Sequence, residues 1–166
     1  LITRVETSTN YICITRPRRF GKSVMANMIA SFFSCACNAE YIFDQLKIAK
    51  SDSYKDHIGR YDVIFISLNE LPRKCRSYEQ YIERIENRLI KDLKEAYPKA
   101  GIQEDDAVWD AFSAVYNSYD SKRFVFILDE WDFIFHRDFV TQKDREEYID
   151  FLSNLLKGKA YVSLAY

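Results

Sequence analysis

Glycine and proline are scarce in this 166-residue chain, which contains 4 Gly and 3 Pro. Because these residues interrupt helices and strands, their scarcity predicts that regular elements make up most of the chain. The sequence also lacks an apolar run of about 18 residues, the length that a membrane-spanning helix needs. The formal net charge is −1, so charge alone draws the chain neither to nucleic acid nor to an anionic membrane.

The 4 cysteines lack the C-x-x-C spacing of common zinc and redox motifs. We expect reduced thiols in an intracellular, cytoplasmic protein with no membrane partner. Cys35, Cys37 and His57 offer an alternative metal set, although a convincing fourth ligand is missing. His57 and His136 have no companion cluster, and we assign neither a catalytic role.

Apolar residues make up 48% of the chain and charged residues 30%, the balance of a folded globular protein. The length suits one domain with an ordinary core. The chain opens at Leu1 and closes on the apolar run AYVSLAY. We therefore expect residues 1–166 to form a single, incomplete domain cut from a larger protein.

Strand-length apolar runs alternate with amphipathic segments of helix length. We expect buried strands at residues 11–15, 62–68, 124–128 and 161–165. Helices are predicted over 22–34, from a capping box at Ser77 and Gln80 to about residue 97, from an acidic first turn at 104–106 through 116, and from Thr141 to Gly158. The first of these presents an apolar face of Val24, Met25, Met28, Ile29, Phe32 and Phe33. Strands joined by helices form a parallel sheet with helices on both faces, so an α/β fold is predicted.

The segment YICITRPRRFGKSVM ends its loop in Gly-Lys-Ser, between a predicted strand and a predicted helix. A loop that binds phosphate needs backbone N–H groups at a helix N-terminus, a glycine for close approach, a lysine for the β/γ oxygens and a hydroxyl for Mg²⁺. Gly21, Lys22 and Ser23 suit these roles, and Pro17 can shape the exit from the strand. The loop arginines add positive charge, or they form a solvated basic turn. We expect nucleotide contacts from Pro17, Arg18, Arg19, Phe20, Gly21, Lys22, Ser23 and Val24.

The stretch FVFILDEWD places two acids at the end of a predicted strand. Asp129 would lie beside Ser23 and hold the magnesium ion with it, and Glu130 would orient and deprotonate an attacking water. Glu130 and Lys22 are therefore the expected catalytic residues. The alternative is that both acids simply end a strand in solvent.

Three stretches, ITRPRRFGKSVMANMIASFF, DVIFISLNE and FVFILDEWD, together resemble the predicted AAA-ATPase-like family of bacterial and archaeal proteins. Its loop commonly reads R-P-R-R-F-G-K-S, so Arg16 at the usual first glycine matches the family pattern. The resemblance implies a P-loop NTPase of the additional-strand, catalytic-glutamate type, a three-layer αβα sandwich here truncated at both ends. Its last strand would lie between the loop strand and the Asp129 strand.

The resemblance also implies partners beyond this chain. Relatives continue into a polar sensor residue, a fifth strand, a helical lid and often a nuclease-like C-terminal domain of the PD-(D/E)xK type. ATP and Mg²⁺ are the implied cofactors, and a neighbouring subunit or domain is expected to supply an arginine. Asp132 matches the family string, and we expect it to make a structural hydrogen bond.

Outside the motifs, packing is the main expectation. Trp109 should be a core residue, and Trp131 should pack or stack on a ligand. Asn69 and Glu70 end the second predicted strand, at the edge where ligands bind in such sheets.

The leading functional hypothesis is a P-loop ATPase domain that binds and hydrolyses ATP as a regulatory module of a larger protein. One alternative is a nucleotide-switched binding module without significant hydrolysis, which could dispense with Glu130. Another is a nucleic-acid-binding fragment of a nuclease-associated protein, which the near-neutral charge disfavours.

Overall fold

The computed structural model describes residues 1–8, 10–14 and 20–166. The chain divides into two compact units. The first unit comprises residues 1–67, 123–129 and 162–166, and the second comprises residues 68–122 and 130–161. Along the described part of the chain, none of the helices combines the length and the apolar character that crossing a membrane requires.

The first unit contains a three-stranded parallel sheet in the order β1-β2-β3. The strands are β1 (Asp62–Ser67), β2 (Phe124–Asp129) and β3 (Val162–Ala165). β1 and β2 pair in continuous register from Asp62 with Phe124 to Ser67 with Asp129. The side chains of Phe124, Val125, Phe126 and Ile127 are 0% exposed, as expected for a central strand that is apolar on both faces. The predicted α/β class and parallel sheet are confirmed.

The predicted strand at 11–15 is reduced to one parallel bridge between Tyr11 and Ala165 among the described residues. Ala165 N donates to Asn10 O and Ile12 N donates to Ala165 O, each at 2.9 Å. Its predicted burial is wrong: Tyr11 is 41% exposed and Ile14 is 38% exposed, because in the described part of the unit only β3 lies beside this segment. β3 nevertheless lies between β2 and Tyr11, the order that the resemblance implies.

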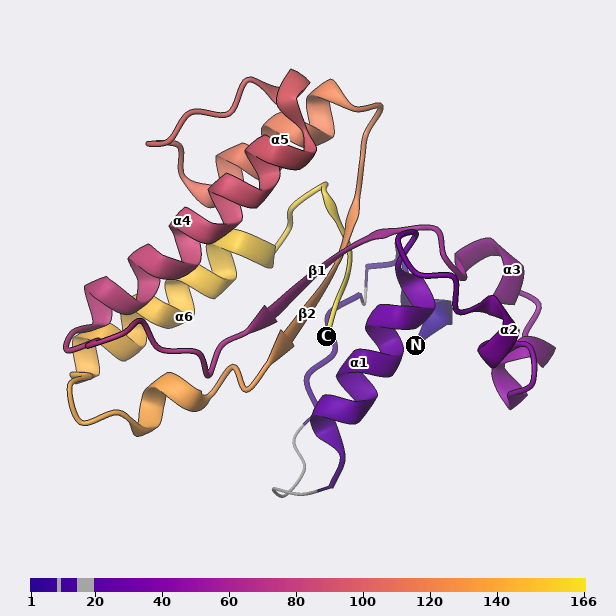
Figure 1. Cartoon of the computed structure of the whole chain (residues 1–166), viewed down its shortest axis with the longest axis horizontal. Helices are drawn as coiled ribbons and strands as arrows, with labels where there is room; N and C mark the ends of the chain where they lie inside the picture. Colours follow the sequence, from indigo (N-terminus) through magenta and orange to yellow (C-terminus); the bar gives the residue numbers. More distant parts are fainter. Residues whose placement is uncertain (9, 15–19) are drawn as a thin grey trace. The chain divides into compact units, whose positions relative to one another are not determined.

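Helix α1 (Lys22–Phe33) packs against β1 and β2 (Figure 1). The predicted apolar face is only partly correct. Ile29, Phe32 and Phe33 are buried, whereas Val24, Met25 and Met28 are 64%, 42% and 42% exposed. The buried face is completed by Ala26, a small residue that allows close approach to the sheet.

Short helices and turns follow α1 between residues 35 and 59. They are α2 (Glu40–Phe43), η2 (Lys47–Lys50) and α3 (Tyr54–His57), with η1 (Ile2–Arg4) near the start of the chain. Phe43 and Tyr54 pack their rings on Phe32, at centroid distances of 5.2 and 5.9 Å. Tyr54 also donates a hydrogen bond to Asp44 Oδ1 at 2.9 Å. Aromatic packing therefore links this segment to the core beneath α1.

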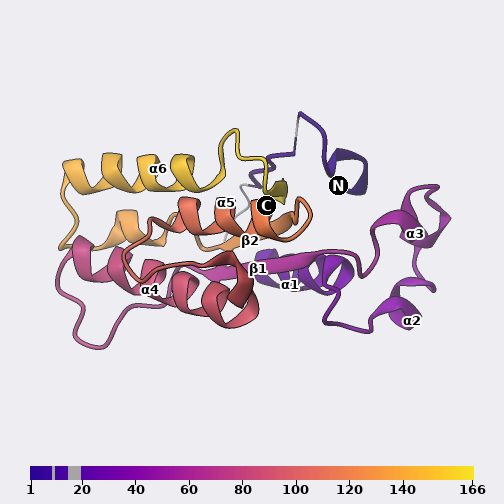
Figure 2. The ribbon, with the colours of Figure 1, turned by 90° about the horizontal axis from the view of Figure 1, so that it is seen from above.

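The second unit contains α4 (Tyr78–Ala96), α5 (Val108–Ser118) and α6 (Gln142–Leu156), with η3 (Pro98–Ala100) and η4 (Phe133–His136) between them. α5 contacts both α4 and α6 (Figure 2). Apolar side chains of α5 fill the interface, and Val108, Ala111, Phe112 and Val115 are all 0% exposed. The ring of Phe112 stacks on Tyr161 at a centroid distance of 5.2 Å.

The helix starts agree with the predicted signals to different degrees. Thr141 and Asp144 form a complete capping box at α6. Ser77 accepts from the Gln80 N–H as predicted, but the Gln80 side chain accepts from Arg76 N at 2.9 Å, one residue before the expected partner. The predicted start of α5 is wrong. Asp106 Oδ2 accepts from Gln103 N at 2.8 Å in a turn ahead of the helix, so α5 begins at Val108.

Candidate functional site

The start of α1 has the backbone that the glycine-lysine-serine segment predicts. Gly21 is the N-cap residue, with a left-handed φ of 74° that favours glycine. A Cβ added at Gly21 would meet nothing within 4 Å in the described structure, so conformation rather than packing requires a glycine there. Met25 N donates to Gly21 O at 2.9 Å and closes the first turn.

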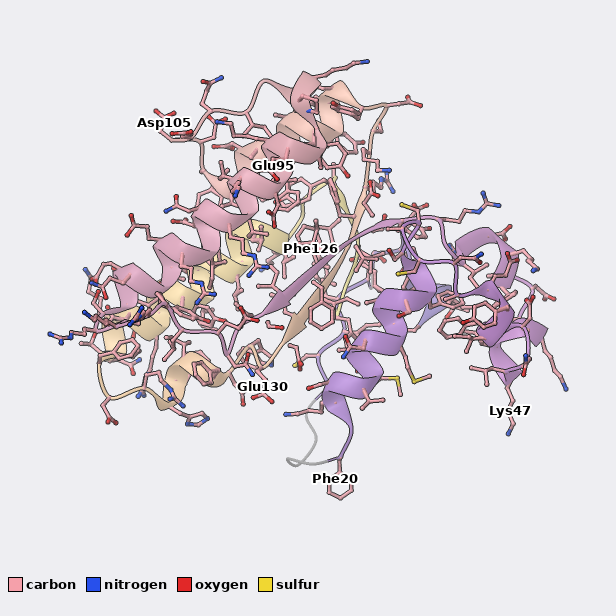
Figure 3. The ribbon with its side chains drawn as sticks, in the orientation of Figure 1. Phe20, Lys47, Glu95, Asp105, Phe126 and Glu130 are labelled. Carbon is pink, nitrogen blue, oxygen red and sulfur yellow. The ribbon has the colours of Figure 1, made fainter. Side chains whose placement is uncertain are left out.

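The first turn of α1 carries no acidic side chain. Its N–H groups and partial positive charge are therefore not neutralised from within the helix, which favours an anion at this end. Lys22 is half-buried, and Ser23 and Val24 are exposed. Phe20, just before the helix, is 65% exposed and extends away from α1 (Figure 3). Arg16 and the predicted nucleotide contacts Pro17, Arg18 and Arg19 lie outside the described residues.

Asp129 is the last residue of β2 and pairs in register with Ser67 of β1. The four preceding positions from Phe124 to Ile127 are fully buried, whereas Leu128 and Asp129 are half-buried. The chain thus delivers a carboxylate to the carboxyl end of a buried central strand, at the boundary between the core and solvent.

The start of α1 and the end of β2 lie at the same end of the sheet. Figure 1 shows α1 beginning at the end toward which the arrowheads of β1 and β2 point. The parallel pairings give the same result, because Tyr11 runs parallel to β3, and β3 runs parallel to β2. The segment that leads toward Lys22 and the strand that leads to Asp129 therefore run in the same direction within the first unit.

Glu130, labelled in Figure 3, follows Asp129. Its backbone has a φ of 55°, a conformation that glutamate rarely adopts. Left-handed backbone costs a residue with a Cβ roughly 1–2 kcal/mol. Glu130 O accepts from Phe133 N at 2.9 Å, which makes a turn into η4. The predicted catalytic position therefore carries local backbone strain, a feature that is common where a side chain must be aimed.

The other acidic candidates occupy structural positions. Asp132 is the N-cap residue of η4, and its side chain makes no capping hydrogen bond. Glu70 forms exposed ion pairs with Arg84 at 3.3 Å and Arg88 at 3.6 Å. Asn69 precedes Glu70 in an exposed turn after β1. Glu70 is thus engaged on the surface of the second unit.

Among the aromatic and histidine candidates, Trp131 and His57 make contacts within the fold. The Trp131 ring meets Phe135 edge-on at 5.9 Å. Trp109, expected to be a core residue, is only half-buried on α5. His57 Nδ1 shares a hydrogen bond of 2.8 Å with the Tyr61 hydroxyl, and His136 ends η4.

The alternative metal set does not assemble. Cys35 Sγ donates to Asp62 Oδ1 at 2.9 Å. Within residues 1–8, 10–14 and 20–166 there is no group of three or more His, Cys, Asp or Glu side chains arranged to hold a metal ion. Cys13, Cys35, Cys37 and Cys75 are free cysteines in the described structure.

Sequence reasoning missed two buried tyrosines that hold the segments following β1 and β2. Tyr81 of α4 donates to Leu68 O at 2.7 Å, and Tyr148 of α6 donates to Trp131 O at 2.8 Å. The signal was available, because a tyrosine at a buried helical position needs a partner for its hydroxyl. The identity of that partner depends on tertiary structure and cannot be read from helical spacing.

Comparison with known proteins identifies one family. The family model described as "Predicted AAA-ATPase" matches residues 1–162, nearly the whole chain. The search of curated proteins and the search of solved structures each found no significant match. The resemblance carried by the three sequence stretches is thereby confirmed.

Proposed function

The chain belongs to the predicted AAA-ATPase family, and from this premise we propose that it binds ATP with Mg²⁺ and hydrolyses it in a P-loop site. One observation carries the proposal. The glycine-capped start of α1, with Lys22 and Ser23, and the end of β2, with Asp129, lie at the same end of one parallel sheet. Ligands bind at the carboxyl ends of strands in open α/β sheets, so this is the expected place for a nucleotide.

The side chains at this end suit the implied cofactors. The uncompensated N-terminus of α1 suits a phosphate, and Lys22 adds a flexible cation beside it. Ser23 and Asp129 supply a hydroxyl and a carboxylate, the oxygen ligands that Mg²⁺ accepts. We propose that they hold the ion, whose charge would offset the negative charge that accumulates on the phosphoryl oxygens.

We assign the remaining catalytic roles to protein side chains. Lys22 would hold the β- and γ-phosphate oxygens and stabilise charge as the bond to the departing diphosphate lengthens. Glu130, one peptide bond after Asp129, would accept a proton from the attacking water and orient it in line with that bond. An arginine from a neighbouring subunit or domain would raise the rate by roughly 10³- to 10⁵-fold, so this chain alone should turn over slowly.

The test compares magnesium-dependent ATP binding and hydrolysis in four proteins: wild type, Lys22→Ala, Glu130→Gln and the control Lys47→Ala. Lys47 is an exposed lysine of η2, away from the start of α1 (Figure 3). Lys22→Ala should weaken ATP binding, whereas Lys47→Ala should bind like wild type. Glu130→Gln should bind ATP but lose hydrolysis. Undiminished binding by Lys22→Ala would refute the loop assignment.

Two controls separate this proposal from its alternatives. A thermal-shift series with ATP, GTP and ADP, each with and without Mg²⁺, reports binding directly, because a ligand at 100 times its Kd stabilises by about 2.7 kcal/mol. Wild-type protein that binds ATP but turns it over no faster than Glu130→Gln is a nucleotide-switched binding module. Steeply salt-dependent DNA binding that ATP does not compete with identifies a nucleic-acid-binding fragment.

A further inference from the structure

Tyr148 is a fully buried residue whose hydroxyl reaches the backbone beside Glu130. It lies on α6, is 0% exposed, and donates to Trp131 O at 2.8 Å. Its ring meets Phe135 edge-on at 5.7 Å, and Phe135 in turn meets the Trp131 ring at 5.9 Å. One side chain thus contacts the segment after Glu130 through both a hydrogen bond and ring packing.

The two carbonyl groups that follow the Glu130 Cα are both held by hydrogen bonds. Glu130 O accepts from Phe133 N at 2.9 Å, and Trp131 O accepts from the Tyr148 hydroxyl. The first bond is local to the turn, whereas the second ties the turn to α6. Because φ of Glu130 is 55°, the residue needs its surroundings to keep it in a conformation that it would otherwise leave.

We propose that Tyr148 is a positioning residue for Glu130: its hydroxyl bond to Trp131 O holds the left-handed turn that aims the Glu130 carboxylate at the attacking water. This inference rests on the proposed ATPase function. Tyr148 acts through the backbone, so its loss should lower the rate of hydrolysis and leave ATP binding at the α1 end unchanged. A misplacement of about 1 Å at a reacting group can cost roughly 10²-fold in rate.

The Tyr148 hydroxyl is a constant donor. Burial, followed by its interaction with Tyr81, raises the pKa of Tyr148 far above the ordinary value for tyrosine. Asp132, Tyr78 and Tyr81 are the charged and titratable groups that act on it, and Tyr78 and Tyr81 have raised pKa values as well. The tyrosine therefore stays protonated, and able to donate to Trp131 O, well above the pH at which an ordinary tyrosine ionises.

The test removes one oxygen atom. Tyr148→Phe keeps the ring and deletes the bond to Trp131 O. The matched control is Tyr161→Phe. Tyr161 is 1% exposed and its hydroxyl donates to Leu155 O at 2.5 Å, so this variant also deletes a buried bond from a hydroxyl to a backbone carbonyl. Both variants should lower Tm. Tyr148→Phe should lower kcat by roughly 10- to 10²-fold with Kd for ATP within about twofold of wild type, and Tyr161→Phe should leave kcat unchanged.

A double-variant cycle tests whether Tyr148 acts through Glu130. In a Glu130→Gln background, Tyr148→Phe should produce no further loss of the residual rate, because its effect requires the carboxylate. A spectroscopic measurement is independent of activity. With Trp109→Phe, Trp131 is the remaining one of the chain's 2 tryptophans, and its emission should shift to longer wavelength in Tyr148→Phe but not in Tyr161→Phe.

The outcomes separate the two proposals. Wild-type protein that neither binds nor hydrolyses ATP overturns the proposed function. The positioning role alone is overturned by a different pattern: wild-type protein hydrolyses ATP in a way that depends on Glu130, but Tyr148→Phe leaves kcat and the Trp131 emission unchanged. Equal losses of kcat in Tyr148→Phe and Tyr161→Phe also overturn it, because they indicate a general loss of stability.

Discussion

The left-handed backbone at Glu130 predicts that this residue lowers the free energy of unfolding, although its carboxylate is needed for the proposed hydrolysis. Glu130→Asn removes the carboxylate and introduces a side chain that adopts left-handed φ more readily than glutamate. The strain at φ 55° costs roughly 1–2 kcal/mol. If asparagine relieves about half of this strain, the free energy of unfolding should rise by about 0.5–1 kcal/mol. For a chain of this size, that corresponds to a Tm increase of about 1–4 °C.

Three variants separate backbone strain from chemistry. Glu130→Gln keeps an unbranched side chain of the same length, so it should lose hydrolysis without gaining stability. Glu130→Asn should lose hydrolysis and gain stability. Lys74 also has left-handed φ, 64°, in the exposed loop before α4, so Lys74→Asn should gain stability and keep full activity. The loss of a general base should cost roughly 10²- to 10⁴-fold in rate.

The assays are urea unfolding followed by circular dichroism, and magnesium-dependent ATP hydrolysis at a saturating ATP concentration. An unfolding free energy for Glu130→Asn that is equal to or lower than that of Glu130→Gln would show that φ is not a stability cost at this position. Equal stabilisation by Glu130→Asn and Lys74→Asn, with activity lost only in the former, is the expected pattern.

Two further predictions concern the cores of the two units. Phe112→Ala removes a ring that is 0% exposed and stacked on Tyr161, so urea unfolding should show a loss of about 3–5 kcal/mol, whereas Ile149→Ala, at a side chain 46% exposed, should stay within about 1 kcal/mol. Burial and the hydrogen bond to Asp44 raise the pKa of Tyr54 to about 12, and burial raises the pKa of Tyr81 to about 12. Because unfolded tyrosines titrate near pH 10, this stabilisation is complete below about pH 10 and is lost as pH rises through about 12. The free energy of unfolding, measured from about pH 9 upward, should show that decline, and Tyr54→Phe should make the decline smaller. A free energy of unfolding that stays constant across the range would contradict the raised pKa values.

The elements that the sequence predicted well depend on local signals. β1 and β2 both contain apolar runs of strand length, which predict strands at these places; β2 is buried as expected, whereas β1 is mostly half-buried, with Ile66 as its buried residue. Thr141 and Asp144 cap α6 through atoms three residues apart. These features depend on neighbours along the chain, so no knowledge of the tertiary fold is needed to find them.

The errors arise where tertiary packing chooses among similar options. On α1, Met25 and Met28 are apolar residues like Ile29, yet Ile29 is buried and the methionines are exposed. Tertiary packing makes a similar choice on α6, where the apolar Ile149 is exposed while Tyr148 and Phe151 are buried. Helical spacing gives the period of the apolar face, but it fixes the orientation of that face only to within about one residue. The residues that are buried in the structure can therefore differ from those of the predicted face.

The candidate site likewise contains some features that local sequence signals predict and others that they do not. Gly21, Lys22 and Ser23 at the start of α1 and Asp129 at the end of β2 are placed by motifs that follow a strand or precede a helix, and the structure has both elements at the expected residues. Neither the conformation of Glu130 nor its support by Tyr148 has a local signal. Glutamate is not a residue that predicts left-handed φ, and Tyr148 is 18 positions away from it.

Two left-handed residues, Gly21 and Glu130, therefore represent different solutions to the same backbone problem. At Gly21 no side chain is required by the proposed chemistry, and glycine adopts φ 74° without strain or further support. At Glu130 the proposed chemistry requires a carboxylate, so the strain cannot be removed by glycine and must be opposed by contacts. The hydrogen bonds of Phe133 N to Glu130 O and of Tyr148 to Trp131 O are such contacts. A relative that replaces Tyr148 by phenylalanine should then keep its activity only where another donor reaches the Trp131 carbonyl, or where the residue at position 130 has left the left-handed region.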